Sequence, residues 1–297
     1  MRQWPENAFL DLEPELARRD RARFVILPIP YEQTTTYKQG CARGPDAIIE
    51  ASAHLEKFDE QLQSEFHHIG IHTHPHFLFG TEDADTALLK IHDTALAVFS
   101  EGKFPLSLGG EHSIAAPLVQ AARKHYPKLS VLHFDAHADL RDTYQNSKYN
   151  HACVMHRIFD MKVPFASVGI RIYCLEEFEF LQKHNIPYFP PESVTDSRTD
   201  VTERILEFLS EQVYITFDID ALDLSVAPGT GTPDPGGLTY RQCLALLEAV
   251  GRHKQIVGAD IVEVMPIPPN HITEFTAARL AYKIITYAQR HLQIDRP

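Results

Sequence analysis

Short apolar runs alternate with helix-length amphipathic segments along almost the whole chain, and this alternation restricts the possible folds most strongly. The apolar runs are rich in β-branched and aromatic residues and cover 24–29, 104–108, 129–134, 165–170, 213–217 and 256–262. The amphipathic segments cover 86–99, 115–125, 175–184, 201–210, 240–252 and 275–291. Strands that are apolar throughout are typical of parallel sheets with helices on both faces. The sequence therefore predicts an α/β fold with three layers, α/β/α, around a mostly parallel sheet.

Composition and length narrow the class of protein. No repeat or linker divides the 297 residues, so we expect a single domain over residues 1–297. No stretch is long and apolar enough for a membrane span, and the N-terminus lacks the apolar core of a signal peptide. The four cysteines lack CxxC spacing, which favours a reducing cytoplasm over a disulfide framework. The net charge of −12 disfavours nucleic acid as a partner and favours a small cationic molecule.

Acidic and histidine side chains follow four of the predicted strands at the point where each strand ends. In parallel sheets, ligands bind outside the carboxyl ends of the strands. We therefore expect these side chains to meet at one edge of the sheet. They are His112, Asp135, His137, Asp139, Asp218, Asp220 and Glu263.

The spacing of these residues indicates metal binding. Asp135, His137 and Asp139 recur at every second position, which places three possible ligands on one side of the chain. Carboxylate with imidazole suits manganese, zinc, iron or nickel. A turn capped by aspartates is the alternative for this triplet, and equally for Asp218 and Asp220. Taken together with His112, however, the set carries too much charge to bury without cations, and six ligands are the right number for two divalent ions.

Several long motifs resemble those of the ureohydrolase family, which includes arginase and agmatinase. They are GGEHS at 109–113, FDAHADLR at 134–141, TFDIDALD at 216–223 and APGTGTPDPGGLT at 227–239. The segment PYEQTTTYKQGCARGPDAIIEAS, 30–52, resembles the agmatinase-like form of the family. The similarity extends from Pro28 to Leu280. Two places depart from the family pattern: Ala152, where glycine is common, and 271–276.

The resemblance implies a central eight-stranded parallel sheet, as in arginases and the distantly related deacetylases, with two Mn²⁺ ions at its end. Matching motifs imply that His112, Asp135, Asp139 and Asp218 hold one ion, and that Asp135, His137, Asp218 and Asp220 hold the other. His151 matches a mobile acid/base histidine, and Glu263 matches the carboxylate that binds the guanidinium. Asp139 could also help to carry a proton. A homotrimer or homohexamer is implied as well.

The implied reaction is metal-dependent hydrolysis of a guanidino compound to urea and an amine. Residues 140–150 lack the run of threonine and serine that arginase shows there, which favours agmatine, converted to putrescine. N1-aminopropylagmatine, a precursor of spermidine, and guanidinobutyrate are alternative substrates. Outside this class stand a single-zinc, deacetylase-like amide hydrolase and a non-catalytic homologue. All six ligand positions are present, which disfavours both.

Overall fold

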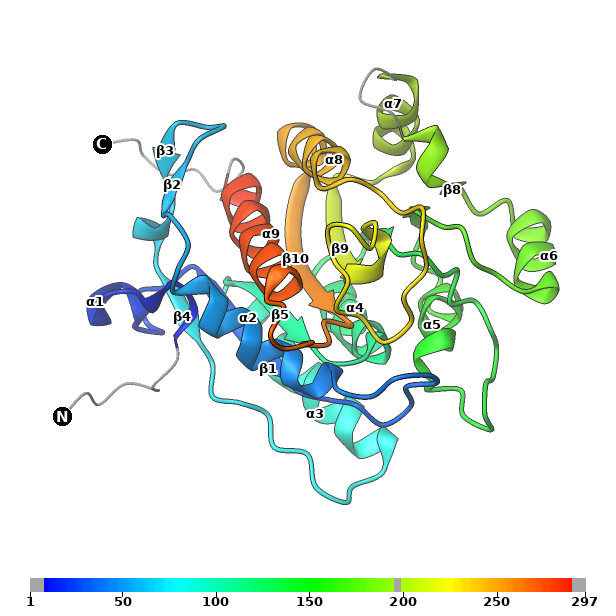
Figure 1. Cartoon of the computed structure of the whole chain (residues 1–297), viewed down its shortest axis with the longest axis horizontal. Coiled ribbons are helices and arrows are strands. Elements are labelled where there is room, and N and C mark those ends of the chain that lie inside the picture. Colours follow the sequence, from blue (N-terminus) through cyan, green and yellow to red (C-terminus); the bar gives the residue numbers. More distant parts are fainter. Residues whose placement is uncertain (1–7, 195–198, 290–297) are drawn as a thin grey trace.

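The computed structural model describes residues 8–194 and 199–289, and a fully parallel eight-stranded sheet forms its centre (Figure 1). The strand order is β4-β1-β5-β10-β9-β6-β7-β8. In chain order the strands are β1 Phe24–Ile29, β4 Ile71–Thr73, β5 Phe104–Gly109, β6 Ser130–Phe134, β7 Phe165–Val168, β8 Tyr188–Phe189, β9 Gln212–Asp218 and β10 Gln255–Val262. Every neighbouring pair is parallel, as the apolar runs predicted.

Helices cover both faces of the sheet, so the predicted three layers are confirmed. One apolar core lies between the sheet and α2 Gly44–Ser52, α7 Thr199–Phe208, α8 Tyr240–His253 and α9 Ile272–Ala288. The other lies under α3 Ala84–Ser100, α4 Ala115–His125, α5 Val154–Asp160 and α6 Leu175–His184. In Figure 1, α8 and α9 lie on the near side of the sheet. Strands β1, β5 and β6 are buried from end to end because both of their faces meet helices.

The departures from the prediction involve short elements. Two edge strands, β4 and β8, are too brief to give an apolar run in the sequence. The helices α2 and α5, with nine and seven residues, were also not predicted. The predicted helix 275–291 starts earlier, at Ile272, and its last two residues lie outside the described part.

A small hairpin, β2 Phe58–Asp59 and β3 Ser64–Glu65, packs against α9; a short helix, α1 Pro14–Ala17, precedes β1. Lys283 Nζ on α9 lies 2.9 Å from Asp59 Oδ2, and both side chains are only 1% exposed. Arg279, one turn earlier, pairs with the exposed Glu60. Lys283 Nζ also lies 3.0 Å from Glu60 Oε1, so the hairpin is held to α9 by the buried Lys283–Asp59 pair and by two ion pairs to the exposed Glu60.

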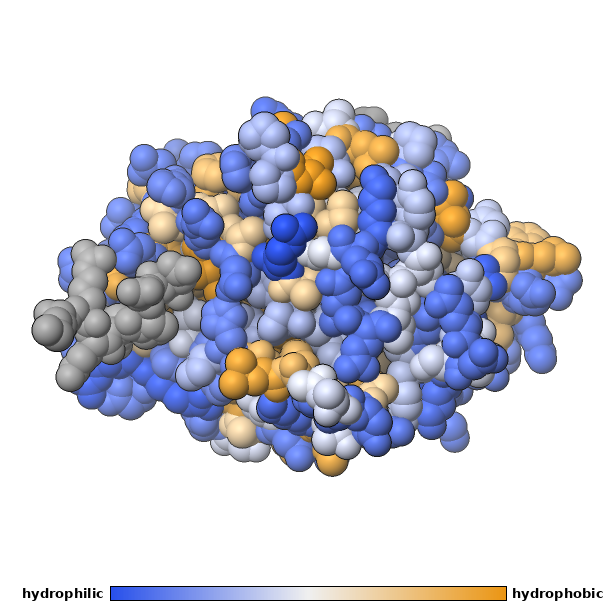
Figure 2. All heavy atoms as spheres, turned by 60° about the horizontal axis from the view of Figure 1, so that its bottom comes forward, coloured by the Kyte–Doolittle hydropathy of each residue, from blue (hydrophilic) through white to orange (hydrophobic). Residues whose placement is uncertain are grey.

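The surface is largely hydrophilic on the side that Figure 2 shows, with apolar residues in small separate groups. Among the helices of the described residues, none combines the length and apolar character that crossing a membrane requires.

Candidate metal centre

Four neighbouring strands bring the predicted site residues together. β5, β10, β9 and β6 lie side by side in the sheet, and their carboxyl ends therefore share one edge. His112 starts a short 3-10 helix just after β5, Asp135 follows β6, Asp218 ends β9, and Glu263 follows β10. The expected convergence at this edge is what the structure shows.

His112 lies at the centre of one group of oxygen atoms. Its Nδ1 atom is 3.0 Å from Asp135 Oδ2, 3.3 Å from Asp139 Oδ2 and 3.5 Å from Asp218 Oδ2. The side chain is fully buried, and Nδ1 makes no hydrogen bond to any described residue. The other nitrogen, Nε2, is 2.9 Å from Thr216 Oγ1. A buried imidazole nitrogen that faces three carboxylates without a hydrogen bond fits a cation between them.

His137 forms a second group at the mouth of the site. Its Nδ1 atom lies 3.0 Å from Asp220 Oδ2 and 3.4 Å from Asp135 Oδ1. Asp135 therefore presents one carboxylate oxygen to each group. Asp218 also links the two, because its Oδ2 faces His112 while its Oδ1 accepts a hydrogen bond from Asp220 N.

The electrostatics of the cluster favour cations. Burial and the nearby carboxylates of Asp220 and Asp135 raise the pKa of Asp218 well above its usual value. Burial and Asp135 likewise raise the pKa of Asp139. Burial alone would raise the pKa of Asp135, but contacts with His112 and other histidines hold it well below normal. Because crowded carboxylates resist ionisation, this oxygen and nitrogen donor set fits divalent cations that would neutralise it.

Two residues at the site have a left-handed backbone. Asp139 has φ 51° and Glu263 has φ 62°, values that are uncommon for residues other than glycine. Such conformations persist where the surrounding structure determines them, and they concentrate at functional sites. Both side chains are thereby turned into the cluster.

Glu263 and His151 form a buried pair beside the cluster. His151 Nδ1 lies 3.1 Å from Glu263 Oε1, which also accepts a hydrogen bond from the backbone N–H of His112 at 2.8 Å. His151 lies in a 3-10 helix, His151–Cys153, capped by the Asn150 side chain. Burial opposes protonation of His151, but the hydrogen bond and charge of Glu263 raise its pKa to about 9. An acidic group and a proton donor thus lie next to the possible cation positions.

The sequence analysis did not identify two residues that the structure places at this site. His133 is fully buried, with Nε2 2.9 Å from Asp135 Oδ2 and Nδ1 2.9 Å from Ser167 Oγ. Thr216 contacts His112 and donates to Asp260 Oδ1 at 2.7 Å. Each lies two positions before an aspartate of the cluster, so continuing the alternation backwards along the strand would have found both.

Glu111 fixes the 33–36 segment, which follows β1, next to the site. Its Oε2 accepts from the N–H groups of Gln33 and Thr34 at 2.7 and 2.5 Å. Its Oε1 accepts from Thr34 Oγ1 and Ser113 Oγ at 2.7 and 2.5 Å. Burial raises the pKa of Glu111, against these hydrogen bonds. Three of these donors belong to the segment and hold it to the buried carboxyl. In the sequence, only the position of the segment within the 30–52 motif indicated a role.

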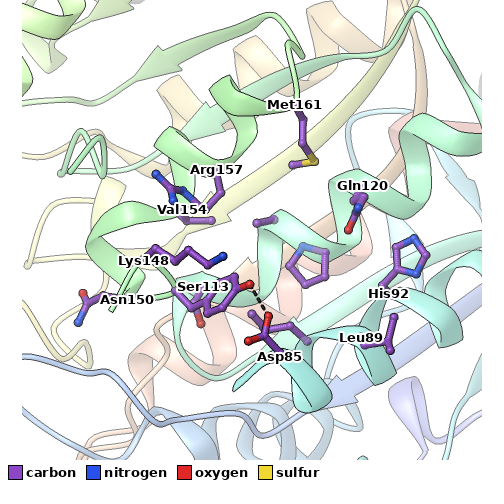
Figure 3. A pocket seen from close by; sticks show the side chains of 14 residues that line it. Asp85, Leu89, His92, Ser113, Gln120, Lys148, Asn150, Val154, Arg157 and Met161 are labelled. Atoms are coloured by element: carbon purple, nitrogen blue, oxygen red, sulfur yellow. Dashed lines mark hydrogen bonds between the residues drawn. The ribbon is translucent and has the colours of Figure 1, made fainter. Parts of the chain in front are cut away.

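A separate cavity of about 440 Å³ lies between α3, α4, α5 and residues 148–150 (Figure 3). Figure 3 shows Lys148, Asp85 and His92 around it, and the Tyr149 hydroxyl donates a hydrogen bond to Asp85. None of the clustered aspartates lines it. The cavity is therefore distinct from the ligand cluster.

Comparisons with known proteins agree with this geometry. Residues 22–286 match the model of the arginase family. N(1)-aminopropylagmatine ureohydrolase of Thermus thermophilus is 41% identical over 266 residues, covering 90% of each chain. Agmatinase of Pyrococcus horikoshii is 34% identical over 279 residues, covering 91% of this chain and 93% of that protein. The crystal structure of agmatine ureohydrolase of Thermoplasma volcanium has a TM-score of 0.84 at 32% identity, with 92% of both chains covered.

Proposed function

The chain belongs to the arginase family and is a ureohydrolase that acts on a guanidino compound, and we propose that its reaction takes place at the aspartate and histidine cluster. Enzymes of this family use a binuclear metal centre. The single observation that supports this location best is that Asp135 presents one oxygen to the His112 group and the other to the His137 group. A carboxylate placed in this way can bridge two ions.

The proposed ligands follow from the two groups of donor atoms. One ion would be held by His112, Asp135, Asp139 and Asp218, and the other by Asp135, His137, Asp218 and Asp220. Mn²⁺ is the proposed metal, because carboxylate and imidazole together suit it. When bound, the two ions would lower the pKa of water and so supply hydroxide near neutral pH.

The remaining roles belong to side chains of the chain itself. Glu263 would accept N–H donors of the planar guanidinium in a charge-assisted contact. His151, whose Nδ1 already faces Glu263, would give its proton to the leaving amine. Asp139, which faces the same space, would help to carry a proton away from the attacking water. Urea and a primary amine would leave.

We propose N1-aminopropylagmatine as the preferred substrate, with agmatine second. The sequence motifs alone favoured agmatine. The relative named as N(1)-aminopropylagmatine ureohydrolase is 41% identical, compared with 34% for the relative named agmatinase. Both substrates are cations that suit an acidic protein, and the products would be spermidine and putrescine. Guanidinobutyrate would bring a carboxylate to an acidic protein and is third.

Urea release from these three compounds and arginine, with Mn²⁺ supplied, tests the proposal. We expect the highest kcat/KM for N1-aminopropylagmatine and no activity after thorough chelation. Asp135→Asn should abolish turnover, whereas Asp93→Asn, an exposed aspartate on α3, should leave it unchanged. Full activity without metal, or in the Asp135 variant, would contradict the proposed site. A higher kcat/KM for agmatine would reverse only the order of substrates.

The same proposal includes a homotrimer or homohexamer of single-domain subunits in the cytoplasm. All four cysteines lie in the described residues as free thiols, which fits a reducing compartment. Four exposed apolar side chains cluster near the start of α6 and are candidates for a subunit contact: Ile172, Tyr173, Leu175 and Phe178. Light scattering after gel filtration would measure the number of subunits.

A further inference from the structure

Thr36 contacts the one nitrogen of His151 that Glu263 does not reach. Its Oγ1 atom lies 3.2 Å from His151 Nε2, while Nδ1 on the other side of the ring lies 3.1 Å from Glu263 Oε1. The imidazole is thus held from two sides by groups 227 residues apart in the sequence (263 minus 36). A ring held at both nitrogens cannot rotate about its last side-chain torsion without losing a contact.

The position of Thr36 is itself fixed by the 33–36 segment. Thr34 Oγ1 donates to Glu111 and accepts from the backbone N–H of His151 at 2.9 Å. Thr34 O accepts from Asn150 Nδ2 at 3.1 Å. The segment is therefore joined both to the buried Glu111 and to the backbone of the His151 helix. This arrangement holds Thr36 next to Nε2 of His151 before any substrate binds.

We propose that Thr36 is a positioning residue whose hydroxyl keeps Nδ1 of His151 directed at the leaving nitrogen of the substrate. This rests on the proposed function, in which His151 is the proton donor. When Glu263 binds a guanidinium, its oxygens are engaged by the substrate, and the contact with Thr36 becomes the remaining hold on the ring. The hydroxyl is therefore needed most in the substrate complex.

In the proposed proton transfer, Thr36 is only a hydrogen-bond partner and neither gains nor loses a proton. The imidazolium carries protons on both nitrogens, and Nε2–H donates to Thr36 Oγ1. As the C–N bond breaks, its electron pair goes to the leaving nitrogen, which takes the proton from Nδ1. His151 is then neutral with its proton on Nε2, still bonded to Thr36. Of the two protons of the consumed water, one restores the imidazolium and the other protonates the amine product.

Three single variants in the Mn²⁺-loaded enzyme test the inference. Thr36→Val keeps the shape but removes the hydroxyl, and we expect kcat to fall about 10–100-fold with KM changed less than about threefold, because small misplacements of catalytic groups cost this much. Thr36→Ser should recover most of kcat. Thr35→Val is the matched control, because the Thr35 side chain makes no hydrogen bond among the described residues, and it should behave as wild type.

The outcomes separate this inference from the proposed function. Wild-type kcat in Thr36→Val, or a Thr36→Ser variant as slow as Thr36→Val, would overturn the positioning role. If His151→Ala loses turnover while Thr36→Val does not, only the role of Thr36 fails. If His151→Ala keeps full turnover, the proposed role of His151 fails and this inference with it. A double variant no slower than His151→Ala supports action of Thr36 through His151.

Discussion

Replacing Asp218 by asparagine is expected to change the stability of the metal-free and metal-loaded protein in opposite directions. Burial, followed by repulsion from Asp220 and Asp135, raises the pKa of the Asp218 carboxyl well above normal. Its folded state therefore holds a proton that the unfolded chain releases. Stability of the metal-free protein must then fall as pH rises above the ordinary carboxyl pKa. The asparagine variant removes this loss and should be less sensitive to pH between about 5 and 7.

The two effects can be given magnitudes. Relieving a poorly compensated buried polar group is worth about 1–3 kcal/mol, so the metal-free variant should gain about that much. In the loaded protein, Asp218 is a proposed ligand of both ions. A hundredfold loss of affinity for each ion removes about 2.7 kcal/mol of stabilisation per ion, or about 5.4 kcal/mol together. The loaded variant should therefore be about 2–4 kcal/mol less stable than loaded wild type.

Thermal unfolding, with EDTA and with saturating Mn²⁺, measures both differences. For a chain of this size, 1 kcal/mol corresponds to about 1.5–2 °C in Tm. We therefore expect the variant to melt higher than wild type in EDTA and lower in Mn²⁺. Asp93→Asn, 65% exposed at its side chain, should change neither Tm appreciably. If Asp218→Asn lowers Tm in EDTA, the account of crowded carboxylates is wrong, and if Mn²⁺ stabilises it like wild type, Asp218 is not a ligand.

Four further variants test other parts of the molecule. His151→Ala should retain its Mn²⁺ by metal analysis but lose about 10²–10⁴-fold in kcat, and an unchanged kcat would exclude it as the proton donor. Glu263→Gln should lower kcat/KM about 10–200-fold, because a hydrogen bond to a charged group contributes about 1.5–3 kcal/mol; near-normal kinetics would rule out its binding of guanidinium. Lys283→Met leaves Asp59 buried and unpaired and should cost about 3–5 kcal/mol in thermal unfolding. Arg279→Gln at the exposed pair should cost less than about 1 kcal/mol, and equal losses would contradict this reasoning.

The main strands of the fold could be predicted because each is apolar throughout. Strands β1, β5 and β6 are buried at every residue, so their sequences carry the signal of a sheet covered on both faces. The edge strands β4 and β8 lack this signal because three and two residues are too few to show a pattern. Helix α5 has only seven residues, directly after the His151–Cys153 turn, and its periodicity covers barely two turns.

The candidate ligands could be predicted from the sequence, but contacts between the loops around them could not. Candidate ligands such as Asp135 and Asp218 lie at the carboxyl ends of strands, so the topology of a parallel sheet places them at one edge. The contact of Thr36 with His151 joins two loops 115 residues apart in the sequence. Its existence depends on how Glu111 binds the 33–36 segment, which no local pattern expresses. Contacts between loops therefore had to come from the structure.

Matching triplets on two neighbouring strands explain how the proposed bridging carboxylates come to lie together. β6 ends in His133-Phe134 before Asp135, and β9 ends in Thr216-Phe217-Asp218. His133 is in register with Thr216 and Phe134 with Phe217, whose rings stack with centroids 4.7 Å apart in the core. Because side chains alternate between faces, a slip of one residue in either strand would move its phenylalanine to the opposite face of the sheet and turn its carboxylate away from the site. Packing of the two rings thus favours the register on which the proposed binding of two ions depends.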